Sequence, residues 1–273
     1  MSQNPRLSVS SWSLHRTLGR PEFYGAALGE IPQDSHNRGE VTLLGLPERL
    51  AGFGIRTLEI CHFHLPEVDG GYLAELRGEL ETHGVELWSL LVDDGDLTHP
   101  EHAERDLNWI EGWLGVAEQL GAKNVRVIAG KQPANSETLD QARRYLELLT
   151  RIAALRGVRV LTENWFDLVA HPADLLWLLD QLQGDLGLCF DFGNWNGPHK
   201  YENLEAIAQY ATSCHTKAAF SSEGVLDRDD YVRCLDITRA AGFAGPYTLI
   251  FDGPGDEWAG LAAEREVVAP YLV

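Results

Sequence analysis

Short apolar, β-rich runs alternate with amphipathic segments along the whole chain. Between the runs, apolar residues recur at helical spacing; in residues 105–122, for example, Leu107, Ile110 and Leu114 fall on one face. Eight strands alternating with eight helices are therefore predicted. The strands are expected at residues 7–12, 55–61, 85–92, 124–129, 157–163, 186–191, 212–217 and 247–252.

Glycines mark several of the expected helix-to-strand turns, because glycine readily takes the left-handed conformation that ends a helix. Gly54, Gly84 and Gly157 stand directly before three of the strands. In 273 residues, this alternation is typical of an α/β protein with one (β/α)8 TIM barrel domain spanning residues 1–273. A doubly wound open sheet is the alternative. That fold would bring a Gly-rich phosphate loop after the first strand, and SWSLHRTLGRP is not such a loop.

One connection is unusually long. Residues 16–42, between the first strand and the first helix, are polar and contain no convincing helical pattern. Long loops in compact domains are often lids or binding loops, so we expect a lid over the mouth of the barrel. A surface excursion without function is the alternative.

Four polar residues stand where β-rich runs stop in the C-terminal half: Glu163, Asp191, His215 and Asp252. The carboxyl ends of parallel barrel strands meet at one mouth, so these side chains are expected to converge. Three carboxylates and one imidazole suit a single divalent ion, with Mn²⁺, Mg²⁺, Co²⁺ and Zn²⁺ all compatible. For each residue alone, the alternative is a helix cap or a loop salt bridge.

Further polar and aromatic residues are candidates for binding substrate. Lys217 shares a strand face with His215, and Arg126 lies on the fourth expected strand; both could offset developing negative charge. The alternative for Arg126 is a buried pair with an acid, Glu59 or Asp93. Two further expectations come from position. Glu59 is expected inside the barrel as a positioning acid, and Trp165 could stack on a sugar ring or simply pack in its loop.

Composition narrows the partners and the location. The formal charge of −19 and the lack of a basic run argue against nucleic acid, which needs Lys and Arg to neutralise phosphates. The four cysteines form no CxxC motif, so neither a disulfide framework nor a structural zinc site is indicated. No run reaches membrane-spanning length, and MSQNPRLSVSS has no apolar signal core. We expect a cytoplasmic protein, with a homodimer as the default assembly.

The motifs TENW, CFDFGN, CHTKA and TLIFDG, with RTLEICHFH and AKNVRVIAG before them, resemble the xylose isomerase-like TIM barrel superfamily of sugar phosphate isomerases and epimerases. Such enzymes hold one divalent ion with Glu, Asp, His and Glu on the last four strands. The resemblance therefore implies Glu163, Asp191 and His215 as metal ligands. It also implies that His62 lines the pocket after the second strand.

The chain departs from that family pattern at two positions. Anchoring the register on Gly253 puts Ile250 where the last ligand should be, and Asp252 lies two residues further on, about 6.6 Å along a strand. Asn194 replaces a His that relatives often use to contact substrate. Asn can hydrogen-bond a hydroxyl group but cannot shuttle protons.

These features predict a metal-dependent isomerase or epimerase that transfers a proton next to the carbonyl of a sugar, sugar phosphate or polyol. Glu163 would act as ligand and base, and Lys217 would support the oxyanion. One alternative is a dehydratase or lyase acting on a cyclic polyol or keto-acid. Another is a metal-free ligand-binding barrel, which Ile250 favours. An abasic-site endonuclease is disfavoured by Asn194 and by the negative charge.

Overall fold

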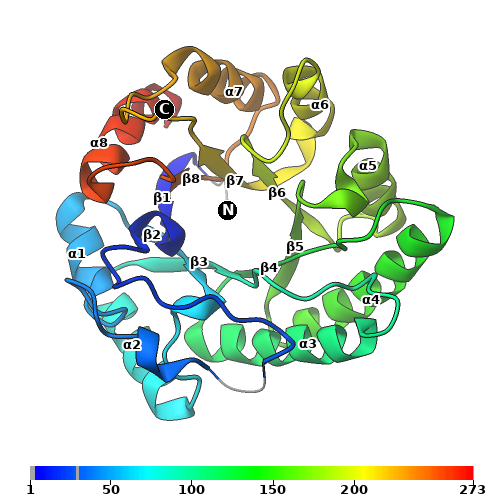
Figure 1. Cartoon of the computed structure of the whole chain (residues 1–273), viewed down its shortest axis with the longest axis horizontal. Helices are drawn as coiled ribbons and strands as arrows, with labels where there is room; N and C mark the ends of the chain where they lie inside the picture. Colours follow the sequence, from blue (N-terminus) through cyan, green and yellow to red (C-terminus); the bar gives the residue numbers. More distant parts are fainter. Residues whose placement is uncertain (1–3, 29–30, 273) are drawn as a thin grey trace.

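The eight strands close into one parallel barrel, as predicted. In the computed structural model, which describes residues 4–28 and 31–272, each strand pairs in parallel with the next, and the last pairs with the first. Figure 1 looks down the barrel axis and shows the helices as an outer ring. The strands are β1 (Arg6–Ser10), β2 (Thr57–Cys61), β3 (Glu86–Leu91), β4 (Asn124–Val127), β5 (Arg159–Glu163), β6 (Gly187–Asp191), β7 (Ala211–Lys217) and β8 (Pro246–Ile250).

One α-helix follows each strand, and its buried apolar face packs against the barrel. Gly54 and Gly121, at the ends of α1 and α3, have φ angles of 85° and 74°, as expected for left-handed helix caps. The helices are α1 (Leu46–Phe53), α2 (Gly70–Thr82), α3 (Ala103–Leu120), α4 (Ser136–Leu155), α5 (Pro172–Gln181), α6 (Lys200–Ile207), α7 (Arg228–Ala240) and α8 (Glu257–Val268).

All eight expected strands are confirmed, but most of them are shorter than predicted, and the last one ends two residues early. β8 ends at Ile250, which pairs with Lys217, and residues 251 and 252 lie beyond this last pair. Phe251 is buried against Phe220, with ring centroids 4.9 Å apart. Phe251 is apolar and buried although it is not part of the strand. The apolar run in the sequence therefore continues past the end of β8, which made the predicted strand too long.

The long connection between β1 and α1 packs across the ends of neighbouring strands. In its described parts it contains two short 3-10 turns, η1 (Ser11–Leu14) and η2 (Gln33–Ser35), and no α-helix. The His36 side chain contacts the carbonyl oxygen of Phe63 at 3.0 Å, and Ala26 N–H donates to Asp94 Oδ2 at 2.9 Å. This segment is part of the wall of the barrel mouth. Its movement as a lid stays a prediction, and residues 29 and 30 lie outside the described part.

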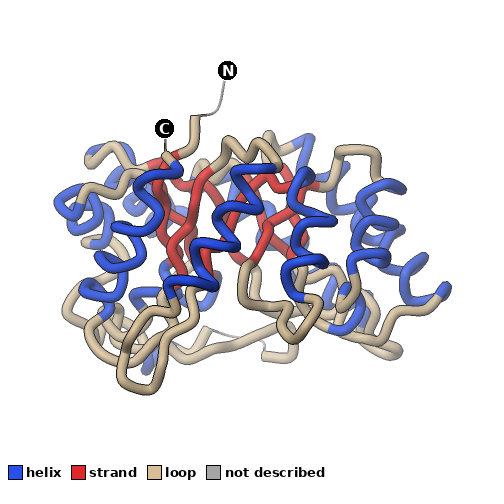
Figure 2. The backbone as a smooth tube through the Cα atoms, turned by 90° about the horizontal axis from the view of Figure 1, so that it is seen from above, coloured by secondary structure: helices blue, strands red, loops and turns tan. Residues whose placement is uncertain are grey.

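Figure 2 shows the first and last described residues on one side of the barrel and the longer loops on the other. The strands run toward the side with the longer loops, so the carboxyl end of every strand lies there. Among the described residues, no helix has both the length and the apolar character needed to cross a membrane.

The acid Glu264 of α8 is fully buried, and among the described residues its carboxyl oxygens have no well-aligned hydrogen bond, only a weak contact with the backbone of Ile250. Burial raises the pKa of Glu264 well above its usual value of 4.5. Because the folded state holds this proton more tightly than the unfolded state, Glu264 destabilises the fold increasingly as the pH rises above 4.5.

We therefore expect Glu264→Met to raise the free energy of unfolding by about 1–3 kcal/mol at pH 7. Urea unfolding at pH 7 and at pH 4 would measure the change, and the gain should be smaller at pH 4. Glu266→Met, on the neighbouring exposed position of α8, is the matched control and should change stability little. A loss of stability in Glu264→Met at pH 7 would show that the carboxylate has an important partner.

Candidate active site

A cavity of about 430 Å³ opens at the carboxyl ends of the strands. Charged and polar side chains from the ends of β3 to β7 line it, together with aromatic side chains from several loops. The residues that line it include Trp12, Phe23, Phe63, Asp93, Asp94, Arg126, Lys131, Glu163, Trp165, Phe166, Asp191, Asn194, His215, Lys217 and Ile250.

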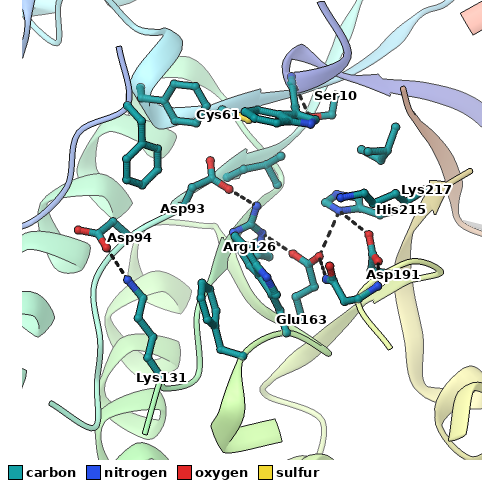
Figure 3. A pocket seen from close by; sticks show the side chains of 18 residues that line it. Ser10, Cys61, Asp93, Asp94, Arg126, Lys131, Glu163, Asp191, His215 and Lys217 are labelled. Carbon is teal, nitrogen blue, oxygen red and sulfur yellow. Dashed lines mark hydrogen bonds and ion pairs between the residues drawn. The ribbon is translucent and has the colours of Figure 1, made fainter. Parts of the chain in front are cut away.

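Three of the predicted ligands meet at one point in this cavity. His215 Nδ1 lies 3.6 Å from Glu163 Oε1 and 3.9 Å from Asp191 Oδ2. All three side chains are buried, and they come from the ends of β5 and β6 and from β7 (Figure 3). The barrel closure brings them together, since neighbouring parallel strands present their carboxyl ends side by side.

The acid Glu59 of β2 orients the imidazole from inside the barrel. It is fully buried; Ser213 Oγ donates to Glu59 Oε1 at 2.8 Å, and His215 Nε2 donates to Glu59 Oε2 at 2.6 Å. A carboxylate only accepts, so Nε2 carries the proton and Nδ1 faces Glu163 and Asp191. This is the arrangement by which a carboxylate fixes a metal-binding histidine. The predicted interior position of Glu59 is observed.

The guanidinium of Arg126 joins two acids. Its Nη2 lies 2.5 Å from Asp93 Oδ1, its Nη1 donates to Val92 O at 3.2 Å, and its Nε lies 3.0 Å from Glu163 Oε2. The last contact is a close ion pair without hydrogen-bond alignment. Each nitrogen of Arg126 therefore faces protein, and the side chain positions Glu163. Asp93, one of the two alternative partners weighed from the sequence, is the acid that Arg126 pairs with.

The two carboxylates of the cluster have opposite pKa shifts. Burial alone would raise the pKa of Glu163, but Arg126 and His215 hold it below its usual value. Burial, with the charge of Glu163 nearby, raises the pKa of Asp191 to about 6. Two neighbouring buried carboxylates repel each other, so the site favours a cation between them.

The raised pKa of His215 also indicates that the cluster favours a positive charge. Burial alone would lower it, but nearby negative groups, Glu59 and Glu163 among them, raise it well above 6.5. Without a metal, the imidazolium supplies the positive charge. Glu163, Asp191 and His215 offer buried oxygen and nitrogen donors of the kind that suits a divalent ion, and Glu59 orients the imidazole.

The end of β8 differs from the other three strand ends. Ile250 lines the cavity, whereas Asp252 lies past the strand, with its side chain 47% exposed and its Oδ2 3.2 Å from Lys217 Nζ. The structure does not bring Asp252 to the cluster of Glu163, Asp191 and His215. The reason is the early end of β8, which directs residue 252 toward solvent.

His62 does not reach the cavity either. The turn η3 (His62–His64) directly follows β2 and buries this side chain in an aromatic cluster that includes Trp109 and Trp113. Its Nε2 donates to Tyr24 O at 2.8 Å, and its Nδ1 accepts from Asp93 N–H at 3.1 Å. His62 thus supports the cavity wall from behind. The resemblance to the family could not show this, because the direction of the chain after β2 depends on packing.

The other predicted site residues do line the cavity. Asn194 Nδ2 donates to Glu163 Oε1 at 2.7 Å, so Asn194 orients the carboxylate that Arg126 holds from the other side. The Trp165 ring lies 5.4 Å from the Arg126 guanidinium. Lys217 extends beside His215 (Figure 3).

The aromatic wall was largely missed by sequence reasoning. Trp12 was predicted to end the first strand but lies in the turn η1 after it, and nothing in the polar pattern of residues 16–42 singled out Phe23. Phe166 has a φ of 65° and a ψ of 174°, a conformation that is rare and costly outside glycine. Its ring packs on Trp165 with centroids 4.2 Å apart. Backbone strain that carries a side chain into a cavity wall is visible only in the structure.

Comparison with known proteins agrees with this fold. A family model described as xylose isomerase-like TIM barrel matches residues 47–265. A xylose isomerase-like TIM barrel protein from Mycobacterium smegmatis, solved in complex with magnesium, has 14% sequence identity and a TM-score of 0.70, with 98% of each chain covered.

Two further solved structures carry names of enzymes. The probable 3-DHS dehydratase from Bacillus anthracis has 13% identity and a TM-score of 0.67, with 97% of this chain and 98% of that one covered. D-allulose 3-epimerase from Methylomonas sp. has 14% identity and a TM-score of 0.64, with 90% and 84% covered. At these identities the likeness is one of fold. A search of curated proteins found no match.

Proposed function

Because this chain belongs to the xylose isomerase-like TIM barrel family, we propose that it is a divalent-metal-dependent enzyme that transfers a proton next to the carbonyl of a small, uncharged polyol or sugar. The convergence of Glu163, Asp191 and His215 at one end of the cavity carries this proposal. These three residues would hold the ion. When bound, the ion acts as a Lewis acid that polarises a substrate carbonyl.

The chain's own residues have separate roles in the proposed reaction. Glu163 takes the proton from carbon, and Arg126 and Asn194 hold its carboxylate in place from two sides. Glu59 keeps Nδ1 of His215 directed at the site. Lys217, which lines the cavity beside His215, supports negative charge on the substrate oxygen.

Among the described residues, no acid on the β8 side of the cavity faces Glu163. Ile250 lies where the resemblance places the second acid, and Asp252 is directed away from the cluster. Epimerisation at one carbon normally needs an acid or base on each face of the substrate. The site therefore favours isomerisation by a single base, with dehydration of a cyclic polyol or keto-acid as the second candidate. Solved structures named as an epimerase and as a probable dehydratase share the fold.

The charges in the cavity favour an uncharged substrate over a sugar phosphate. Each of the three Lys and Arg side chains in its wall already has an acidic partner: Arg126 with Asp93, Lys131 with Asp94, and Lys217 with Asp252. A phosphate would have to break one of these pairs to gain a counter-ion. The aromatic side chains offer flat apolar surfaces, which suit the face of a ring.

Exchange of substrate hydrogen with solvent tests this proposal, whichever product the reaction forms. The protein would be incubated in D₂O with each of Mn²⁺, Mg²⁺, Co²⁺ and Zn²⁺ and with matched panels of neutral and phosphorylated ketoses and cyclic polyols. We expect deuterium next to the carbonyl of a neutral compound, detected by mass spectrometry and abolished by a chelator.

Three results would contradict parts of the proposal. Exchange that survives complete removal of metal would exclude metal dependence. Faster exchange of the phosphorylated panel would exclude the preference for uncharged substrates. The absence of stoichiometric metal binding would favour the alternative of a metal-free ligand-binding barrel.

A further inference from the structure

A fourth possible donor lies beside the cluster of Glu163, Asp191 and His215. One ligand atom each of Glu163, Cys189 and His215 lies within 4.8 Å of the other two. Cys189 is on β6, two residues before Asp191, so both side chains point to the same face of the strand. It pairs with Glu163 in the ladder between β5 and β6, and it is 1% exposed.

The surroundings of Cys189 differ from those of the other cysteines. Cys61, Cys214 and Cys234 belong to the continuous apolar core, although Cys61 also lines the cavity, whereas Cys189 is buried beside the carboxylate of Glu163 and the imidazole of His215. A cysteine that only fills apolar space has apolar neighbours, whereas Cys189 lies beside two possible metal ligands.

The site is one anionic ligand short on the side of β8, where Ile250 lines the cavity. A coordinating thiol loses its proton, so Cys189 would restore the negative charge that a carboxylate at position 250 would have supplied. Metal–sulfur distances of about 2.3 Å and metal–nitrogen or metal–oxygen distances of about 2.0–2.2 Å allow two ligands of one ion to lie about 4.5 Å apart. The three donors lie within 4.8 Å of one another, which is compatible with binding one ion after small movements of the side chains.

We propose that Cys189 is a ligand of the metal, together with Glu163 and His215, and that its sulfur selects Zn²⁺ or Co²⁺ over Mg²⁺. This inference rests on the metal dependence of the proposed function. Thiolate is a soft ligand that favours zinc-like ions, whereas Mg²⁺ prefers oxygen ligands and water. On binding, the thiol proton leaves to solvent and the sulfur forms its bond to the ion.

Loading the full chain with Co²⁺ tests this inference without a substrate. A cobalt–thiolate bond gives a charge-transfer absorption in the near ultraviolet that oxygen and nitrogen ligands do not give. We expect this band in the wild-type protein and its loss in Cys189→Ala. The affinity for Zn²⁺, measured by competition with a chromogenic chelator, should fall by about 100-fold or more, since even changes to residues behind a ligand cost 10–100-fold.

The control variant is Cys214→Ala, which removes a buried thiol one residue from His215 but on the apolar side of β7. It should retain the cobalt band and the affinity for Zn²⁺. Cys189→Ser adds a second comparison, since its harder oxygen should reduce the preference for Zn²⁺ over Mg²⁺ while the side-chain size is nearly kept. Circular dichroism in the presence of a chelator checks that each variant folds.

The outcomes separate this inference from the proposed function. Stoichiometric Co²⁺ without a thiolate band in the wild-type protein would overturn the role of Cys189 and leave the metal enzyme intact, whether or not the variants fold. A band that persists in Cys189→Ala would also overturn it. Failure of the wild-type protein to bind Co²⁺, Zn²⁺ or Mn²⁺ would overturn the proposed function, and this inference with it.

Discussion

Replacing Glu163 with Gln is expected to slow solvent-exchange catalysis by about 10²–10⁴-fold, because the amide keeps the shape of the side chain but cannot accept a proton. The side chains around Glu163 hold its carboxylate in a defined position. Arg126 and Asn194 hold its two oxygens, and His215 lies 3.6 Å away. The measurement is the rate of deuterium incorporation into the compound that the wild-type protein exchanges fastest.

Metal content must be measured in the same samples, since Gln is also a weaker ligand than Glu. An exchange rate that stays low at saturating metal would identify the lost base rather than the lost ion. Asp252→Asn is the matched comparison, and we expect it to retain most of the activity because Asp252 is directed toward solvent. If Asp252→Asn lost activity and Glu163→Gln did not, the base would lie on the β8 side of the cavity.

Replacing Arg126 with Met is expected to destabilise the metal-free protein by about 3–5 kcal/mol, the typical cost of leaving buried charges without their partner. Arg126 is 3% exposed and pairs with Asp93 and Glu163, which are themselves largely buried. Equilibrium unfolding in urea with a chelator present would measure the loss. Saturating metal should recover part of it, since the ion would provide a new counter-charge for Glu163.

The loss should depend on pH in a defined direction. Burial would raise the pKa values of Asp93 and Glu163, but Arg126 and neighbouring groups lower them below their usual values of 3.8 and 4.5. Lowered carboxyl pKa values stabilise the fold fully above the usual values, and that stabilisation is lost as the pH falls from the usual values toward the lowered ones. The difference between wild type and Arg126→Met should therefore be full at pH 7 and smaller below about pH 4.

Lys131→Met is the matched control for Arg126→Met. Lys131 also lines the cavity and pairs with an acid, Asp94, but their side chains are 28% and 22% exposed. We expect a loss of less than about 1 kcal/mol, as for ion pairs that water reaches. Equal losses in the two variants would show that burial does not set the strength of these pairs.

The alternation of apolar runs and amphipathic segments was sufficient to predict the barrel and all eight strands. Periods of two and 3.6 residues are local properties, and the glycines that end several helices are local as well. Strand parity predicted that Glu163, Asp191 and His215 would share one end of the barrel. Each of them ends or nearly ends a strand of known direction, so closure of the barrel alone determines where they meet.

The tertiary structure decided what lies around those three residues. It directed His62 away from the cavity, paired Arg126 with Asp93 and Glu163, and brought Trp12 and Phe23 from the long connection into the cavity wall. These outcomes depend on contacts between residues far apart in the chain, which no local pattern encodes. The same holds for β8, where the burial of Phe251 ended the strand at Ile250 and left Asp252 toward solvent. The sequence by itself thus determined the fold and three converging donors, whereas packing decided which further side chains reach them.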